Sequence, residues 1–167
     1  MAPKILMVLL ATVATAWAAG PAASLRFDFD PSHMNPMRGH ASGLATFPIE
    51  RASTAPAING LEDDPAWRGA AVLDDFAIPD PVTTAKFCYD DRNLYILMWL
   101  QDPPGKPAQA AKRNRDSNMR NDDFAYFAIT PAPGSPDEYL FKVNAAGAIV
   151  DSLRGDEKWN SQGAFAV

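Results

Sequence analysis

The residues whose types could support catalysis are four pairs of adjacent carboxylates. They are Asp63/Asp64, Asp74/Asp75, Asp90/Asp91 and Asp122/Asp123. A glycosidase needs two carboxyl groups that converge at roughly 5 to 9.5 Å across one bond, whereas adjacent residues of an extended chain point to opposite faces. Each pair stands at a turn or at the start of a strand pattern, where Asp accepts hydrogen bonds from nearby backbone N–H groups. The pairs therefore favour structural roles over acid–base catalysis.

Carboxylates in loops are also hard oxygen ligands, and calcium is bound by about 6 to 8 such oxygens. Two loops supply them, although neither has the fixed spacing of a calcium-binding loop. We therefore keep a structural calcium ion as an alternative to simple turn chemistry, with five candidate ligands: Glu62, Asp63, Asp64, Asp90 and Asp91.

The stretch "HMNPMRGH" offers softer ligands. His33, Met34, Met37 and His40 fall within eight residues and could bind copper or a haem iron. A polar loop is the simpler interpretation, and the absence of C-x-x-C-H excludes covalently attached c-type haem. No nucleophile elbow, phosphate-binding glycine loop or zinc spacing is present. The sequence therefore predicts a non-catalytic domain.

The first residues have the pattern of a secretory signal peptide. Lys4 provides a positive charge, residues 5–15 form a short apolar run, and Ala16-Trp17-Ala18 is a small-residue cleavage site. We expect residues 1–18 to be removed and the remaining chain to be periplasmic or extracellular. The run is shorter than the roughly 20 residues that a transmembrane helix needs, so we expect no such segment in the mature chain.

The net charge restricts the possible binding partners, and the cysteine content restricts how the fold can be stabilised. The formal net charge of −5 becomes more negative once Lys4 is removed, which argues against nucleic acid as a partner. Cys88 is the only cysteine and cannot form an intramolecular disulfide, so stability must come from an apolar core. Cys88 lies within a strand pattern, which favours a buried thiol over a reactive one.

Short strands separated by turns must position these residues. Residues 19–50 read as a linker or a leading strand, with "LRFDFD" as their one alternating fragment. After them, "TAKFCY", "DDRN" and "LYILMWLQD" predict a hairpin whose second strand is apolar on both faces and therefore central. A basic loop over 103–120 precedes "DDFAYFAIT", and "EYLFKVNAAGAIVDSL" predicts a second hairpin. This spacing predicts an antiparallel β-sandwich over 51–167.

Four motifs in this order resemble the family 9 carbohydrate-binding module and its wider group of related domains. They are "PAINGLEDDPAW", "TAKFCYDDRNLYILMWLQD", "NDDFAYFAI" and "EYLFKVNAAGAIVD". The resemblance spans residues 55–167. It implies a jelly-roll-like sandwich that binds polysaccharide without cleaving it, often beside a glycoside hydrolase or another downstream domain. It also implies that further strands follow Val167.

The residues that form the sugar site in this family are replaced at the matching positions of this chain. The family's plant-polysaccharide binders use a Trp before the acidic step, a Glu in the following strand and an Arg in F-R-V-N. The matching positions here are Met119, Ala125 and Lys142. A thioether lacks a π-face, and Lys lacks the bidentate fork of Arg. The resemblance and the loops beside these positions suggest six ligand-binding candidates: Met119, Arg120, Asn121, Lys142, Asn144 and Trp159.

The function expected from the sequence is a secreted, non-catalytic carbohydrate-binding domain that tethers a larger protein to polysaccharide. One alternative is a structural or interaction module of a cell-envelope protein without sugar binding. The other is a haem- or copper-binding sandwich. Of the tryptophans, Trp67 and Trp99 are expected in the core, whereas Trp159 stands in a polar loop and is the one expected to be exposed.

Overall fold

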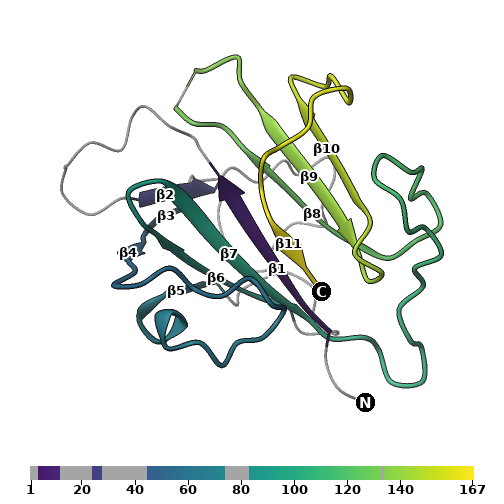
Figure 1. Ribbon diagram of the computed structural model, residues 1–167, viewed down its shortest axis with the longest axis horizontal. Helices are drawn as coiled ribbons and strands as arrows, with labels where there is room; N and C mark the ends of the chain where they lie inside the picture. Colours follow the sequence, from purple (N-terminus) through teal and green to yellow (C-terminus); the bar gives the residue numbers. More distant parts are fainter. Residues whose placement is uncertain (1–3, 12–23, 28–44, 74–82, 133) are drawn as a thin grey trace.

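In the part of the chain that the structure describes, strands make up nearly all the regular structure. The computed structural model describes residues 4–11, 24–27, 45–73, 83–132 and 134–167. In that part, two mainly antiparallel sheets share one apolar core, and a short 3-10 helix, η1 (Pro65–Gly69), lies outside them (Figure 1). The molecule is an all-β sandwich, which confirms the fold class predicted from the spacing of the strands.

The larger sheet is organised around a hairpin of β6 (Thr83–Tyr89) and β7 (Asn93–Leu100). The described strands run in the order β11 (Phe165–Ala166), β1 (Lys4–Ala11), β7, β6 and β4 (Glu50–Arg51), and β5 (Ala71–Leu73) also pairs with β6. β7 has a partner on each edge and Leu94 to Met98 are all buried. The prediction of a central strand that is apolar on both faces is confirmed.

The smaller sheet has the order β10 (Ile149–Leu153), β9 (Tyr139–Asn144) and β8 (Phe124–Ile129). β9 and β10 are joined by the predicted tight turn. Gly147 adopts a φ of 81° there, and its N–H donates to the carbonyl oxygen of Asn144 at 2.9 Å. A side chain at this φ would be strained, which is why glycine suits the position.

β1 is formed by residues that the sequence assigns to the signal peptide. It pairs with β7 along its whole length and with β11 at Met7 and Val8. An apolar run satisfies both roles, because a signal peptide and an interior strand both need consecutive apolar residues. Cleavage after Ala18 stays a prediction; it would remove β1 and leave the β1 edge of β7 unpaired.

Residues 19–50 contain a two-stranded ribbon of β2 (Ser24–Phe27) and β3 (Ala45–Pro48). Ile49, which follows directly, is 1% exposed and belongs to the sandwich core. The histidines and methionines of "HMNPMRGH", and the Asp74/Asp75 pair, lie outside the described residues.

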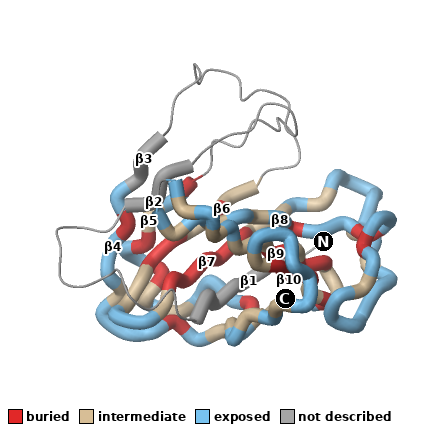
Figure 2. The backbone as a smooth tube through the Cα atoms, turned by 90° about the horizontal axis from the view of Figure 1, so that it is seen from above, coloured by how far each residue is buried: buried red, intermediate tan, exposed pale blue. Residues whose placement is uncertain are grey.

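The core lies between the two sheets, and Figure 2 shows the buried stretch along β7 of the larger sheet. The larger sheet contributes residues such as Phe87, Ile96 and Met98, and the smaller sheet contributes Phe141 and Val143. Phe141 is fully buried, and its ring stacks on that of Phe127 with centroids 5.0 Å apart.

A second apolar cluster lies on the outer face of the larger sheet. Trp67 of η1 is 2% exposed and packs with Cys88, Tyr95 and Leu97. Asp64 caps η1 by accepting a hydrogen bond from the N–H of Ala66 at 2.9 Å. The motif "INGLEDDPAW" therefore has a structural role, because it forms the turn and the helix η1 that place Trp67 against the sheet. The prediction that Trp67 is a core residue is confirmed.

Candidate functional site

The outer face of the smaller sheet carries an exposed aromatic surface. Tyr126, Lys142 and Val150 are direct cross-strand partners on β8, β9 and β10, so they share one face. Phe124 lies two residues before Tyr126 and points to the same side. Ala125 and Phe127, which alternate with these residues along β8, point into the core instead.

Phe124, Tyr126 and Lys142 form what we call the aromatic platform. Phe124, the first residue of β8, is 41% exposed, and Tyr126, within the strand, is 51% exposed. The Lys142 Nζ lies 5.8 Å from the Phe124 ring centroid and 6.0 Å from that of Tyr126. These distances are within the range of a cation–π contact, so the ammonium group lies over both rings.

The platform has the chemistry of a sugar-stacking surface. Two ring faces offer apolar contact to the C–H face of a pyranose, and the lysine ammonium and the Tyr126 hydroxyl can hydrogen-bond its hydroxyl groups. The supporting strands are rigid because both are paired: β9 has neighbours on both edges and β8 pairs with it over six residues.

Phe124 and Tyr126 were not among the residues singled out from the sequence. In "DDFAYFAIT" both alternating sets are apolar or aromatic, namely Phe124 and Tyr126 in one set and Ala125, Phe127 and Ile129 in the other. The pattern does not say which set faces the core. The sequence offered one signal for an exposed aromatic pair: the two aspartates Asp122 and Asp123 directly precede Phe124, in a strand whose two faces are both apolar.

The three positions that correspond to the family's sugar site do not form one site. Ala125 is buried in the core on the inner face, whereas Lys142 is on the outer face. Met119 is 4% exposed and packs with Ala148 and Val150 on the outer side. Of these three, only Lys142 reaches the aromatic platform.

Asn144 is a structural residue, not an exposed ligand contact. It is fully buried, and its amide nitrogen donates to the Lys112 carbonyl oxygen at 2.9 Å and to Asp122 Oδ2 at 2.7 Å. Its Oδ1 accepts from the N–H groups of Ala146 and Ala148. Asn144 thus ties the hairpin turn to the basic loop and to the start of β8, and its proposed place in the ligand site is corrected.

Arg120 and Asn121 are exposed in the turn that leads into β8, where the Asp122 N–H donates to the Met119 carbonyl oxygen. They remain available to a ligand near the platform. Trp159, by contrast, is half-buried: its ring packs edge-on against Tyr139 at 5.4 Å and Phe141 at 6.3 Å. The expectation that Trp159 is exposed is wrong, because its polar sequence neighbours conceal a contact with the core.

The basic loop is fixed to the sheet by an ion pair between a partly exposed arginine, Arg115, and a buried carboxylate, Asp151. Asp151 on β10 is fully buried, and its Oδ2 accepts from Arg115 Nη2 at 2.5 Å and from the Ser161 N–H at 2.7 Å. Arg115 also donates to Asn160. A buried carboxylate needs such partners, so Arg115 links the loop over 103–120 to the C-terminal segment.

The carboxylates considered for calcium have separate local partners. Glu62 pairs with Lys86, and Asp91 with Arg51. Asp64 accepts from Ala57 and Ala66, while Asp63 is exposed. In the described part of the chain, no three His, Cys, Asp or Glu side chains gather in a way that could hold a metal ion. The structure therefore does not bring Glu62, Asp63, Asp64, Asp90 and Asp91 into one calcium site.

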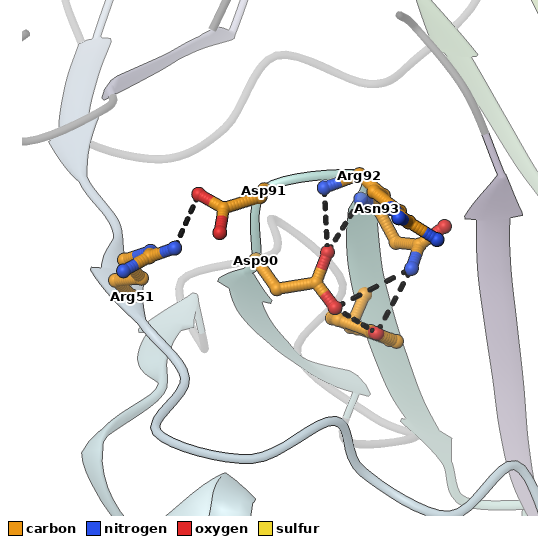
Figure 3. A network of polar contacts seen from close by, with 6 residues as sticks. Arg51, Asp90, Asp91, Arg92 and Asn93 are labelled. Carbon is orange, nitrogen blue, oxygen red and sulfur yellow. Dashed lines mark hydrogen bonds and ion pairs between the residues drawn. The ribbon is translucent and has the colours of Figure 1, made fainter. Parts of the chain in front are cut away.

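Asp90 instead organises the β6–β7 turn, as Figure 3 shows. Its Oδ1 accepts from the N–H groups of Arg92 and Asn93 at 2.7 Å each, and its Oδ2 accepts from the Tyr95 hydroxyl at 2.6 Å. Burial acts to raise the pKa of Asp90, but these hydrogen bonds outweigh it and lower the pKa below its ordinary value. Burial, assisted by the bond to Asp90, raises the pKa of Tyr95 to about 12, so Tyr95 stays a donor.

These turn carboxylates predict a loss of stability in acid. The pKa values of Asp64 and Asp122 are also lowered, chiefly by backbone N–H groups of Ala57 and Lys112 respectively. A folded-state pKa below the unfolded value of about 3.9 stabilises the protein above that pH, and the contribution disappears as the pH falls through the folded value. We expect the free energy of unfolding from urea titrations to fall below about pH 5.

Asp90→Asn provides the control, because the amide oxygen can still accept in the turn but does not titrate. The variant should be less stable than the parent at neutral pH, and the difference should shrink as the pH falls. A difference that stays constant down to pH 3, or grows, would contradict the assignment.

The Cys88 thiol is buried and unreactive. Cys88 is 1% exposed on the outer face beneath Trp67, and burial, with the nearby Asp90 and Asp64 charges, raises the pKa of its thiol to about 12. The thiol stays protonated at neutral pH and is a poor nucleophile. The prediction of a buried, apolar cysteine is confirmed.

Comparisons with family models, curated proteins and solved structures find no match to this chain. The resemblance to carbohydrate-binding modules therefore rests on the sequence motifs alone. Among the described residues, no helix has the length and apolar character needed to cross a membrane.

Proposed function

We propose that this chain is a secreted, non-catalytic carbohydrate-binding domain that holds a larger protein on a polysaccharide. The observation that carries the proposal is the aromatic platform, two exposed rings with a lysine ammonium over both of them on one face of a paired sheet. Large exposed rings on a soluble domain mark a binding surface, because water contact with apolar rings is unfavourable.

The shape of the platform favours a polymer. Phe124 and Tyr126 lie on an open sheet face, and a flat surface can accept a chain at any point along its length, whereas an enclosed pocket accepts only an end. The side chains need no tuned pKa for this task, because stacking and hydrogen bonding do not require proton transfer. Export through the predicted signal peptide would bring the domain to extracellular or cell-envelope polysaccharides.

The test is binding to polymers of different chemistry. The full-length chain is assayed by affinity electrophoresis through xylan and by sedimentation with cellulose and with chitin. We expect retention by at least one polymer. The double variant Phe124→Ala/Tyr126→Ala should bind that polymer roughly tenfold or more weakly, as expected when anchor rings are removed from an interface.

Two conservative variants separate the contributions. Tyr126→Phe keeps the ring and should retain most of the affinity, whereas Lys142→Met removes the charge but keeps the chain length and should weaken binding by a smaller factor than the double variant. Val167→Ala, which trims an exposed apolar side chain near β11, serves as the matched control and should bind normally. If the parent chain binds none of the polymers, the proposal is overturned and a protein-interaction module is favoured.

A further inference from the structure

The larger sheet has a hollow on the face that points away from the core. Thr84 and Lys86 of β6 and Leu97 and Trp99 of β7 line it, alternating along their strands with core residues. Glu62 closes one side from the turn before η1, where its carboxylate forms an ion pair with the Lys86 ammonium. The hollow is partly open to solvent and has a volume of about 220 Å³.

Cross-strand pairing explains how these residues meet. Thr84 lies opposite Trp99 and Lys86 lies opposite Leu97, so the four side chains form two adjacent rows on one face. Next to them, η1 covers Cys88 and Tyr95 with Trp67. Trp99, expected in the core from its mid-strand position, is only half-buried, because the face it occupies is the one that holds the hollow.

The lining combines an apolar wall with hydrogen-bonding groups. The half-buried indole of Trp99 forms most of the apolar part, because Leu97 is only 2% exposed. Lys86 offers N–H donors, Glu62 offers acceptor oxygens, and the Thr84 hydroxyl can do both. A pyranose needs this combination, because its ring carries C–H groups on its faces and hydroxyl groups, each both donor and acceptor, around its edge.

Size and charge restrict the ligand further. Drug-sized ligands occupy pockets of roughly 300 to 1,000 Å³, so a smaller hollow suits one ring. Lys86 and Glu62 neutralise each other, and a charged ligand would have to compete with one of them for the other. We propose that this hollow binds a single neutral pyranose ring. The Lys86–Glu62 pair and Thr84 hydrogen-bond its hydroxyl groups, and Trp99 contacts a ring face.

This site shares a ligand class with the proposed function but none of its residues. The platform lies on the smaller sheet, at Phe124, Tyr126 and Lys142, whereas the hollow lies on the larger sheet. Each site can therefore fail without the other, and the experiment below distinguishes the two results.

The test is an NMR titration of the full-length chain, labelled with ¹⁵N, with D-glucose, D-galactose, D-xylose and N-acetyl-D-glucosamine. The Trp99 indole N–H signal, assigned by its loss in Trp99→Phe, should shift saturably with at least one sugar in the millimolar range. Thr84→Val keeps the shape but removes the hydroxyl, and should weaken that affinity roughly five- to tenfold. Glucuronate should bind more weakly than glucose.

Matched variants decide the location. Trp159→Phe and Phe124→Ala/Tyr126→Ala should leave the Trp99 shift unchanged, because these residues lie outside the hollow. The proposal is overturned if no sugar shifts the Trp99 signal, if Thr84→Val binds as the parent does, or if the platform double variant abolishes the shift. A saturable Trp99 shift in a chain that no polymer retains would support the hollow and reject the polysaccharide function.

Discussion

Phe141→Ala is expected to lower the free energy of unfolding by about 3–5 kcal/mol, the range seen when a fully buried aromatic side chain is truncated. Phe141 is fully buried at the centre of the sandwich and contacts three other aromatic rings, those of Phe127, Trp159 and Phe165. The truncation would leave a cavity that the two paired sheets cannot easily collapse around. Equilibrium denaturation in urea measures the change.

Phe124→Ala is the matched control, because it makes the same chemical change on the neighbouring strand but on the outer face. Its cost should be below about 1 kcal/mol, since Phe124 is 41% exposed. The two variants should also differ in function: Phe124→Ala should impair polysaccharide retention and keep stability, whereas Phe141→Ala should do the reverse while it stays folded. Equal destabilisation by both would contradict the assignment of the two faces of the smaller sheet.

Asn144→Ala should lower the free energy of unfolding by roughly 3 kcal/mol, because it removes one buried side chain that hydrogen-bonds to four partners. The Lys112 carbonyl, the Asp122 carboxylate and the N–H groups of Ala146 and Ala148 would each lose a hydrogen bond. A buried polar group left without a partner costs about 1–3 kcal/mol, and water entering the loop recovers part of this. Asn121→Ala, at an exposed position, should change stability by no more than about 0.5 kcal/mol.

Asn144→Asp gives a sharper test of the same contact. The new carboxylate would face Asp122 Oδ2, which lies 2.7 Å from the amide nitrogen it replaces, so the two groups could not both ionise without repulsion. Their shared proton raises a folded-state pKa above the unfolded value of about 3.9, and the variant should lose stability as the pH rises through that range. The parent chain should show the opposite slope in acid, and parallel slopes would exclude the Asp122–Asn144 contact.

The sequence pattern predicted a residue's environment correctly where that environment depends on the residues next to it in the chain. The β6–β7 hairpin follows from apolar runs around Asp90–Asn93, and the β9–β10 hairpin from the turn at Gly147. Trp67 and Cys88 were placed in apolar surroundings for the same reason. The carboxylates of Asp64 and Asp90 were expected to bond nearby backbone N–H groups, and they do.

The two hairpins, the strand in "DDFAYFAIT" and the β-sandwich class were predictable from the sequence, since strand period and turn chemistry act within a few residues. The strand β1, whose residues match a signal peptide, was not. Tertiary packing leaves Phe124 and Tyr126 exposed and turns Asn144 and Trp159 inward. It also brings Glu62 to Lys86 beside Trp99. Strands that are apolar on both faces do not specify which face meets the other sheet. That choice depends on pairing between segments far apart in the chain. Both proposed binding sites lie on the outer faces of the sheets, which do not meet the other sheet.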